Sequence, residues 1–385
     1  MPTVSFTTLG CRLNQAESDS MAEQLGAAGL HPATRDGEPD IVVVNTCTVT
    51  REATKASRMA IRRAVRAHPD AKVVVIGCYA VSNPAEVEAI EGVDVVLGND
   101  EKERLVEALA PHHATRTLLQ ISMPGRTASL PYRVRANLKV QTGCDEWCSF
   151  CIIPTTRGPL RSMDEDSLVR EARAKVAAGA RELVLTGVHL GKYAYDGGGD
   201  ERDLIRLLRR LLAIEGVWRL RLSSILSNHL TDEVVAFIAG EPRVCRHLHV
   251  PLQAGDDGVL EAMNRPYRID DFITAVERAK DSIPGLALAT DVIVGFPGET
   301  ETEFAATLRV VERIGFSKLH VFRYSERPGT AAAGMAGQIS PEVKRDRSKR
   351  LIDLGNDLRT RYLNDHLRDP VEVLVEDERE VDGAA

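Results

Sequence analysis

Three cysteines stand close together in the stretch TGCDEWCSFCIIP: Cys144, Cys148 and Cys151, called here the late trio. A closed zinc site takes four ligands, and a fully capped cubane iron–sulfur cluster takes four thiolates. Three thiolates leave one iron of a 4Fe-4S cluster without a protein ligand. In an electron carrier such an open iron is a defect, but in an enzyme a small molecule can chelate it. The C-x3-C-x2-C spacing therefore predicts a cluster with an open iron. The alternatives are a zinc site with a distant fourth ligand and three structural thiols.

A second set of three cysteines is spread along the N-terminal part of the chain: Cys11, Cys47 and Cys78, called here the early trio. They follow the segments TTLG, VVNT and VVIG, each the end of an apolar run that predicts a strand. Because parallel strands end at the same edge of a sheet, we expect the three thiols to converge and hold a second 4Fe-4S cluster with an open iron. The alternative is that each is a small buried hydrophobe, which is our interpretation of the isolated Cys245.

The strands that must position these cysteines form two series. The first alternates with helical segments and predicts an open parallel α/β domain over residues 1–110, with strands at 3–10, 40–46, 71–77 and 93–99. Residues 111–131 are rich in Pro, Gly, Ser and Thr and predict a linker. Six strand–helix units follow and predict a partial (β/α)6 barrel over residues 132–340, with strands at 137–142, 182–187, 218–223, 246–250, 288–295 and 318–323. Barrel active sites form at the C-terminal strand ends, which is where the late trio stands.

The rest of the chain predicts a long polar helix within residues 341–369 and a strand-like, then acidic, stretch over residues 370–385. The N-terminus has no basic leader followed by an apolar run, and the apolar runs are too short to span a bilayer. We therefore expect a cytoplasmic protein without membrane contact. In a reducing cytosol a disulfide framework is improbable, which favours metal or catalytic roles for clustered cysteines.

The formal net charge of −7 argues weakly against a nucleic-acid partner, but two predicted helices have local basic faces. The helix after Cys47 carries Arg51, Lys55, Arg58, Arg62 and Arg66 at spacings of three or four. The late helix carries Lys344, Arg345, Arg347, Lys349, Arg350, Arg359 and Arg361. Either helix is a candidate to follow phosphates, and a solvated helix face is the alternative. His112 and His113 are expected to be surface residues of the linker.

These features together resemble the radical S-adenosylmethionine (radical SAM) methylthiotransferase family. The C-x3-C-x-aromatic-C spacing, with Phe150 as the aromatic, is typical of the radical SAM superfamily. The resemblance extends over roughly residues 3–365 through TLGCRLNQAES, VNTCTVT, GCYA, LTGVHLGKY, HVPLQAGDDGVLEAMNRPY, DVIVGFPGETE and FRYSERPGTAAAGM. Within the family, TLGCRLNQ, TGVHLG and YSERPGT look most like the branch that acts on N6-threonylcarbamoyladenosine of tRNA.

The resemblance implies a transferase that adds a methylthio group to C2 of that adenosine, at position 37 beside the anticodon. It implies that a cluster on the late trio makes a 5′-deoxyadenosyl radical from S-adenosylmethionine, and that this radical abstracts hydrogen during activation of the substrate base. A cluster on the early trio would carry the sulfur that a second S-adenosylmethionine methylates. Branches that act on isopentenyladenosine or on a ribosomal-protein aspartate remain open. Outside the enzyme class, an iron–sulfur electron carrier and a zinc-containing RNA-binding module also remain open.

The resemblance further implies contacts with S-adenosylmethionine at the ends of the barrel strands. The residues at the matching positions are Phe150, Thr186, Gly187, Ser223, Ser224, Gln253, Gly295 and Glu299. A loop-closing or capping role is the alternative for each of these residues except Phe150. Gly298 is expected to be a turn residue before a helix that starts at Glu299.

The partners implied are a tRNA substrate, an electron donor such as a flavodoxin or ferredoxin, and a sulfur donor that the residues do not identify. Two departures from the family stand out. Leu226-Ser227 replaces the usual Glu-Pro, which removes a carboxylate at a strand end. Residues 370–385 stand where the family begins a small β-barrel RNA-binding domain of the TRAM type, so we expect a truncated start of that domain and reduced affinity for tRNA.

Overall fold

The computed structural model describes residues 2–34, 37–109, 134–367 and 370–376. The predicted linker, including His112 and His113, lies outside these described residues. The chain forms two compact units: unit 1 combines residues 1–130, 141–161 and 325–335, and unit 2 combines residues 131–140, 162–324 and 336–385. The late trio therefore belongs to the same compact unit as the early trio.

Unit 1 is built on a parallel five-stranded sheet with the strand order β2-β1-β3-β4-β5. Its strands are β1 Thr3–Thr8, β2 His31–Pro32, β3 Ile41–Thr46, β4 Lys72–Gly77 and β5 Val95–Leu97. The central strands β3 and β4 have the sequences IVVVNT and KVVVIG, and nearly all of their residues are buried. Continuous Val and Ile runs of this kind form strands that helices cover on both faces.

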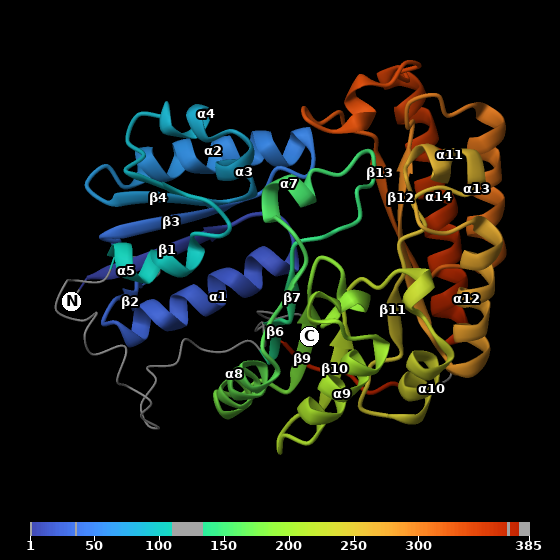
Figure 1. Cartoon of the computed structure of the whole chain (residues 1–385), viewed down its shortest axis with the longest axis horizontal. Helices are drawn as coiled ribbons and strands as arrows, with labels where there is room; N and C mark the ends of the chain where they lie inside the picture. The colour runs from blue at the N-terminus through green and yellow to red at the C-terminus, as the bar shows by residue number, and fades with distance from the viewer. Residues whose placement is uncertain (1, 35–36, 110–133, 368–369, 377–385) are drawn as a thin grey trace, which may run out of the picture. The chain divides into compact units, whose positions relative to one another are not determined.

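Helices pack on both faces of this sheet (Figure 1). One face is covered by α1 Arg12–Ala27 and α5 Leu105–Leu109, and the other by α2 Arg51–Ala67, α3 Cys78–Ser82 and α4 Pro84–Glu88. Because side chains alternate along a strand, Val43 packs in the α1 core with Leu25, whereas Val44 packs in the α2 core with Ile61. Each of these four side chains is at most 1% exposed, and burying one stabilises the fold by about 2 kcal/mol.

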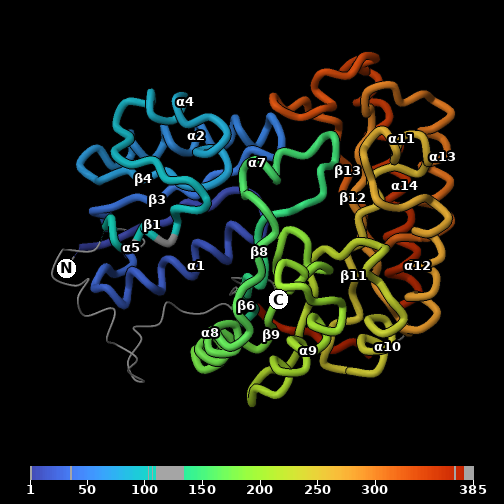
Figure 2. The backbone as a smooth tube through the Cα atoms, in the orientation of Figure 1, coloured from blue at the N-terminus to red at the C-terminus, as the bar shows by residue number. Residues whose placement is uncertain are grey.

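Unit 1 also receives short segments from later in the chain. They are η1 Lys102–Arg104, β7 Gln141–Thr142, α7 Ile153–Arg157 and η5 Ala331–Gly334. Helix α7 lies against α3, as the backbone trace in Figure 2 shows. The segment that follows the late trio is thereby fixed to the segment that begins at Cys78.

Unit 2 contains two parallel three-stranded sheets, with the orders β10-β9-β6 and β11-β12-β13. The strands are β6 Arg135–Lys139, β9 Glu182–Thr186, β10 Arg219–Leu222, β11 His247–His249, β12 Ala287–Val294 and β13 Lys318–Arg323. Isolated parallel bridges join Leu220 to Val244 and Ser224 to His249, between the two sheets. The strands therefore follow one another in chain order as in part of a (β/α) barrel, which confirms the predicted α/β fold class.

Helical segments alternate with these strands. They are α8 Glu165–Ala177, η2 Leu190–Lys192, η3 Tyr195–Gly197, α9 Glu201–Leu212, η4 Ser227–His229, α10 Asp232–Gly240, α11 Asp257–Ala262, α12 Ile269–Ser282, α13 Glu301–Ile314 and α14 Pro341–Asp365. Local sequence sets several helix starts: Asp164 and Thr231 accept backbone hydrogen bonds at the starts of α8 and α10, and Thr300 forms a capping box with Glu303. The short strand β8, Arg161–Ser162, stands where the chain passes from unit 1 to unit 2.

The structure differs from the sequence-based expectations at a few elements. The strand expected at 137–142 begins at Arg135 and is interrupted at Val140, so it becomes β6 and β7. Residues 370–376, the described part of the tail, form neither helix nor strand, so the strand expected there is absent. Among the helices of the described residues, none combines the length and apolarity needed to cross a bilayer.

Candidate functional site

The early trio lies at one edge of the unit 1 sheet, where β1, β3 and β4 end. Cys11 is the residue before α1, Cys47 directly follows β3, and Cys78 is the first residue of α3. The strand order β2-β1-β3 places the reversal of the winding between β1 and β3. In open parallel sheets this switch point forms a crevice at the carboxyl ends of the strands, where ligands bind. Cys11 and Cys47 stand on its two sides.

One close contact and the electrostatic interactions of Cys47 connect the three thiols. A Cβ atom added to Gly10 would lie only 2.8 Å from the Sγ atom of Cys47, so the residue before Cys11 touches Cys47. Burial, with smaller contributions from the nearby Cys78 and Cys11, raises the pKa of Cys47 to about 11. The Nδ2 atom of Asn99 lies 3.5 Å from the Sγ atom of Cys78. Three thiols with one amide donor form a suitable donor set for a cluster held by three thiolates.

Two glycines make this convergence possible. Gly10 and Gly77 have φ angles of +92° and +99°, a conformation that L side chains rarely adopt. A Cβ on Gly77 would lie 2.6 Å from the carbonyl oxygen of Thr46, so the turn into Cys78 has no room for a side chain. Ser57 fixes the third turn, because its hydroxyl accepts from the Cys47 amide and donates to the Cys47 carbonyl. No local sequence pattern indicates the supporting roles of Gly10, Gly77 and Ser57.

A buried cation lies beside the early trio. Arg157, the last residue of α7, donates to Glu17 of α1 at 2.9 Å, and their side chains are 1% and 4% exposed. Arg157 also donates to the amide oxygen of Asn14, and the Asn14 amide donates to the carbonyls of Leu9 and Thr46. Lys102 is a second buried partner of Glu17. The network therefore ties α1, the end of β1 and the end of β3 to the segment that follows the late trio.

The charge of Arg157 acts on the cysteine sulfurs. Burial by itself would lower the pKa of Arg157, but attraction by Glu17, Cys78 and Cys11 raises it above its ordinary value. Arg157 is therefore a permanent positive charge in a water-poor site. Three thiolates are more stable next to such a charge, because electrostatic attraction is stronger at low dielectric. Sequence inspection missed Arg157, since its TTRG segment gives no signal of a contact with residues far upstream.

A second arginine fastens the loop after Cys47. Arg327, in the YSERPGT stretch, donates from its Nη1 atom to the Thr48 carbonyl and to the Thr54 hydroxyl, both at 2.8 Å. Arg51 at the start of α2 pairs with Glu326 at 2.8 Å. The YSERPGT stretch thus supports the backbone around the early trio.

The late trio lies on the short loop between β7 and α7. The Cys144 amide donates to the Gly158 carbonyl, and the Cys151 amide donates to the Cys148 carbonyl, which folds the loop back on itself. Gly143 has a φ of +69°, and a Cβ there would meet the Pro159 carbonyl oxygen at 1.8 Å. Glycine is required at this position.

Two backbone amides point at sulfurs of the late trio. The Glu146 amide lies 3.4 Å from the Sγ atom of Cys144, and the Ile153 amide lies 3.4 Å from the Sγ atom of Cys151. N–H donors of this kind stabilise thiolates and adjust the potential of iron–sulfur clusters. Burial raises the pKa of Cys144 to about 11, so a bound metal must displace its proton. The residues of this loop therefore fit a 4Fe-4S cluster held by three thiolates. Phe150, the aromatic residue of the motif, is half-buried in the same loop.

The residues expected to bind S-adenosylmethionine in unit 2 stand at strand ends. Thr186 ends β9 and is buried, Gly187 follows it, and Ser223 and Ser224 follow β10. The buried Oγ atom of Ser223 has no hydrogen-bond partner among the described residues. Gln253 adopts a φ of +64°, a strained conformation for a non-glycine residue that often marks a functional site.

Glu299 and its neighbours have a clear structural role. The Glu299 carboxylate accepts from the Gly295 amide at 2.6 Å and from Arg347 at 2.7 Å. Burial raises the pKa of Glu299, although Gly295 and Arg347 oppose the shift. The helix expected to start at Glu299 begins instead at Glu301, with Thr300 as its N-cap, because Thr300 and Glu303 form the capping box. Gly298 has a φ of +82°, as expected for a turn residue.

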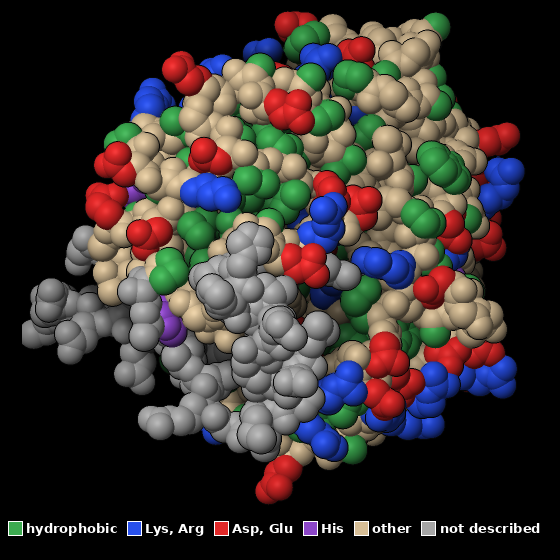
Figure 3. All heavy atoms as spheres, turned by 60° about the vertical axis from the view of Figure 1, so that its left-hand side comes forward, with side chains coloured by type: hydrophobic (Ala, Val, Ile, Leu, Met, Phe, Trp, Pro, Cys, Tyr) green, Lys and Arg blue, Asp and Glu red, His purple; other side chains and the backbone are tan. Residues whose placement is uncertain are grey.

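The late basic helix is largely committed to acidic partners. Arg347 is buried against Glu299, so it does not form part of a solvent-facing basic surface. Arg350 pairs with Glu301, and Lys349 pairs with Asp353. Mixed charge is also seen elsewhere: on the face shown in Figure 3, which brings the left-hand side of Figure 1 forward, Lys and Arg side chains are interspersed with Asp and Glu. Helix α14 is therefore a weaker candidate for phosphate contacts than its composition indicated.

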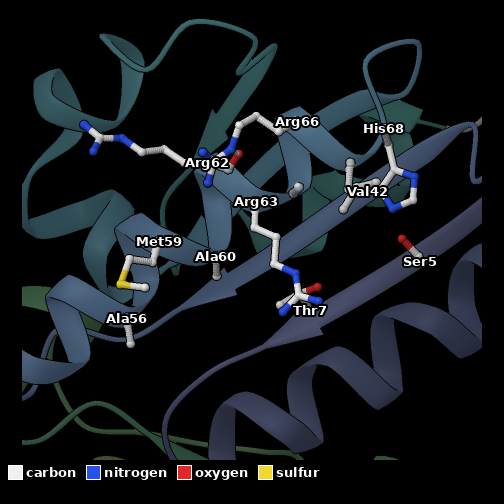
Figure 4. Close-up of a pocket in the computed structure, with 12 residues that line it drawn as sticks. Ser5, Thr7, Val42, Ala56, Met59, Ala60, Arg62, Arg63, Arg66 and His68 are labelled. Carbon is white, nitrogen blue, oxygen red and sulfur yellow. Dashed lines mark hydrogen bonds between the residues drawn. The ribbon is translucent and has the colours of Figure 1, made fainter.

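Helix α2 offers a more open basic surface. Arg62, Arg63 and Arg66, called here the α2 arginines, are exposed and line a cleft of about 760 Å³. Figure 4 shows Arg63 reaching from α2 toward the strand that carries Ser5 and Thr7. Arg58, expected on the same face, pairs with Glu86 instead. Exposed guanidinium groups at a cleft are of the kind that contact a phosphate backbone.

Two other features noted in the sequence lie in unit 2: the Leu226-Ser227 pair and the isolated Cys245. Leu226 and Ser227 are buried at the beginning of η4, and the Ser227 hydroxyl has no partner among the described residues. Cys245 is half-buried, and burial raises the pKa of its thiol. The structure thus gives Cys245 a position in unit 2, away from both trios in the chain.

Two family models match the chain. The model described as the radical SAM superfamily matches residues 138–311, and the one described as "Uncharacterized protein family UPF0004" matches residues 3–98. The first match contains the late trio, and the second contains the early trio.

Curated relatives match nearly the whole chain. Threonylcarbamoyladenosine tRNA methylthiotransferase MtaB of Bacillus subtilis is 40% identical, over 98% of this chain and 85% of the relative. The protein of that name from Thermotoga maritima is 38% identical over 94% of this chain and 84% of the relative. The tRNA-2-methylthio-N(6)-dimethylallyladenosine synthase of Thermobifida fusca is 37% identical over 91% of this chain and 73% of the relative.

Solved structures support the fold. The radical S-adenosylmethionine methyltransferase TsrM of Kitasatospora setae aligns with a TM-score of 0.61 at 17% identity, over 86% of this chain and 77% of that one. At this identity the likeness bears on the fold alone. The arrangement of strands and cysteines and the identity to the curated relatives together lead to one conclusion: the chain belongs to the tRNA methylthiotransferase family of radical SAM enzymes.

Proposed function

We propose that this chain is a tRNA methylthiotransferase that adds a methylthio group to C2 of N6-threonylcarbamoyladenosine at position 37. The observation that carries the substrate assignment is the 38–40% identity to two relatives named for that substrate, over 94–98% of the chain. The second candidate substrate is an N6-dimethylallyladenosine (isopentenyladenosine) nucleotide, because a relative named for it is 37% identical over 91% of the chain. Membership of this enzyme family argues against an electron carrier or a zinc RNA-binding module.

We further propose that the early and late trios each hold a 4Fe-4S cluster. When bound, the cluster on the late trio and S-adenosylmethionine supply a 5′-deoxyadenosyl radical, as in the superfamily. The chain's part is to hold the late-trio thiolates with the amides of Glu146 and Ile153 and to attract the sulfurs of Cys11 and Cys78 with the charge of Arg157. Thr186, Gly187, Ser223, Ser224, Gln253, Gly295 and Glu299 are proposed to form or support the cofactor pocket. The buried, unpartnered hydroxyl of Ser223 is the strongest indication among them.

The tRNA is proposed to bind through phosphate contacts with the α2 arginines. Their exposed guanidinium groups at an open cleft supply the electrostatic attraction that the net charge of −7 does not. A flavodoxin or ferredoxin is proposed as the electron donor, and the cytoplasm, where tRNA is modified, as the location.

The test compares tRNA nucleosides by mass spectrometry from cells with and without the gene. The proposal predicts that 2-methylthio-N6-threonylcarbamoyladenosine disappears and that its precursor accumulates. Loss of the methylthio derivative of dimethylallyladenosine instead would establish the second candidate. Unchanged amounts of both would reject the function.

A further inference from the structure

Unit 2 contains a cluster of two histidines and one aspartate, residue types that bind metal ions, and none of the three belongs to a cysteine trio. His249 ends β11, Asp291 lies in β12, and His320 lies in β13. One ligand atom from each of these residues lies within 4.8 Å of the other two. The Oδ1 atom of Asp291 is 3.0 Å from both the Nε2 atom of His249 and the Nδ1 atom of His320. These three residues are called here the strand triad.

The sheet register explains why the triad meets on one face. Asp291 and His320 are direct neighbours on β12 and β13, and His249 is paired with Ala289, two residues before Asp291. Because side chains alternate, Asp291 points away from the fully buried Thr290 and Val292. On β13, Leu319 contacts Gly355 of α14, so His320 points to the opposite face of the sheet. The triad thus stands on the face that α14 does not cover.

Hydrogen bonding accounts for only part of this arrangement. His320 and Asp291 form an aligned hydrogen bond of 3.0 Å. The Nε2 atom of His249 is buried and equally close to the carboxylate, yet it has no aligned hydrogen-bond partner among the described residues. Both imidazole nitrogens thus lie 3.0 Å from one carboxylate oxygen, so the three ligand atoms are clustered on one face of the sheet.

We propose that His249, Asp291 and His320 bind a divalent first-row transition-metal ion. Two donor atoms about 2.1 Å from one ion and 3.0 Å apart subtend an angle of about 90° at that ion, which is the angle between neighbouring octahedral positions. Two imidazoles and one carboxylate suit Fe²⁺, Mn²⁺, Co²⁺ or Zn²⁺ better than Ca²⁺ or Mg²⁺, which prefer oxygen ligands. Three protein ligands leave coordination positions for water or another oxygen donor. The three ligands belong to unit 2, whereas both cysteine trios belong to unit 1.

The test uses Mn²⁺ as the probe, because manganese has little affinity for thiolates and its unbound form gives a strong solution EPR signal. The full-length, anaerobically reconstituted protein is titrated with Mn²⁺, and unbound Mn²⁺ is measured by EPR. We expect one Mn²⁺ bound per chain, with binding weakened by roughly tenfold or more in Asp291→Asn and in His320→Gln. The matched control is Glu261→Gln, which alters a carboxylate of unit 2 that is 76% exposed, and it should bind like the wild type.

Two variants, Asp291→Asn and His320→Gln, are used so that the proposal can still be refuted if one of them does not fold. His320 is 36% exposed, so His320→Gln is expected to preserve the fold, and circular dichroism checks this for all variants. Absence of bound Mn²⁺ in the wild type, or equal binding in the wild type and folded His320→Gln, would show that the triad is only a hydrogen-bonded group. Because the protein keeps its cysteine-bound iron throughout, failure here would leave the proposed function untouched.

Discussion

Replacing Arg157 with methionine is expected to destabilise the fold of unit 1 by about 3 kcal/mol. The change leaves the buried carboxylate of Glu17 without one of its two cationic partners, while Lys102 remains. Removing one member of a buried ion pair costs about 3–5 kcal/mol, and the remaining lysine places the expected value at the lower end. The midpoint of thermal unfolding should therefore fall by roughly 6–12 °C.

The assay is urea and thermal unfolding of the metal-free, reduced protein, followed by circular dichroism. The matched control is Arg104→Met in the same unit, because Arg104 is 68% exposed and its ion pair with Glu101 should contribute less than about 1 kcal/mol. Arg157→Lys retains the charge without the planar fork and should lose less stability than Arg157→Met. Combining Arg157→Met with Glu17→Gln should cost less than the sum of the single changes.

A second readout concerns the early trio. Since Arg157 attracts the sulfurs of Cys11 and Cys78, the folded Arg157→Met protein should lose iron to a chelator faster than Arg157→Lys. If Arg157→Met is as stable as Arg104→Met and keeps its iron as well as Arg157→Lys does, the buried network neither stabilises unit 1 nor supports the early trio.

Three further predictions concern other parts of the chain. Gly10→Ala should reduce reconstituted iron by about half, because its Cβ would lie 2.8 Å from the sulfur of Cys47; iron equal to wild type would contradict the described contact. Changing the three α2 arginines to glutamine should lower the slope of log affinity for tRNA against log salt by about 2–3, measured by filter binding, and an unchanged slope would place the phosphates elsewhere. Arg347→Met should destabilise the protein by about 3 kcal/mol in urea unfolding, because the buried Glu299 loses its cation; a change below about 1 kcal/mol would mean that Glu299 is solvated.

The parts of the fold that the sequence predicted are those with strong local signals. The Val and Ile runs of β3 and β4 specify buried parallel strands, and Cys47 and Cys78 directly follow them, so their convergence could be expected. The start of α8 follows Asp164, whose side chain caps the helix. The start of α13 was expected at Glu299 but lies at Glu301, because Thr300 and Glu303 form the capping box.

Features that depend on contacts between distant segments were not predictable in this way. Arg157 reaches Glu17 across 140 positions of the chain, and no local pattern announces such a pair. Arg347 carries the same charge as its exposed neighbours on α14, but the helix turns it toward the buried Glu299. The strand triad joins residues from three strands, and its members are visible as a group only once the register of β11, β12 and β13 is known.

The central claim is that each cysteine trio holds its own cluster and that only the late trio generates the radical. The most direct measurement is iron content and 5′-deoxyadenosine formation, after anaerobic reconstitution, for the wild type and for proteins with either trio changed to alanine. We predict about eight irons per chain in the wild type and about four in each variant. Of the two variants, the one that lacks the early trio should form deoxyadenosine, and the one that lacks the late trio should not. Deoxyadenosine formation by the late-trio variant, or iron that does not fall when a trio is removed, would contradict the claim.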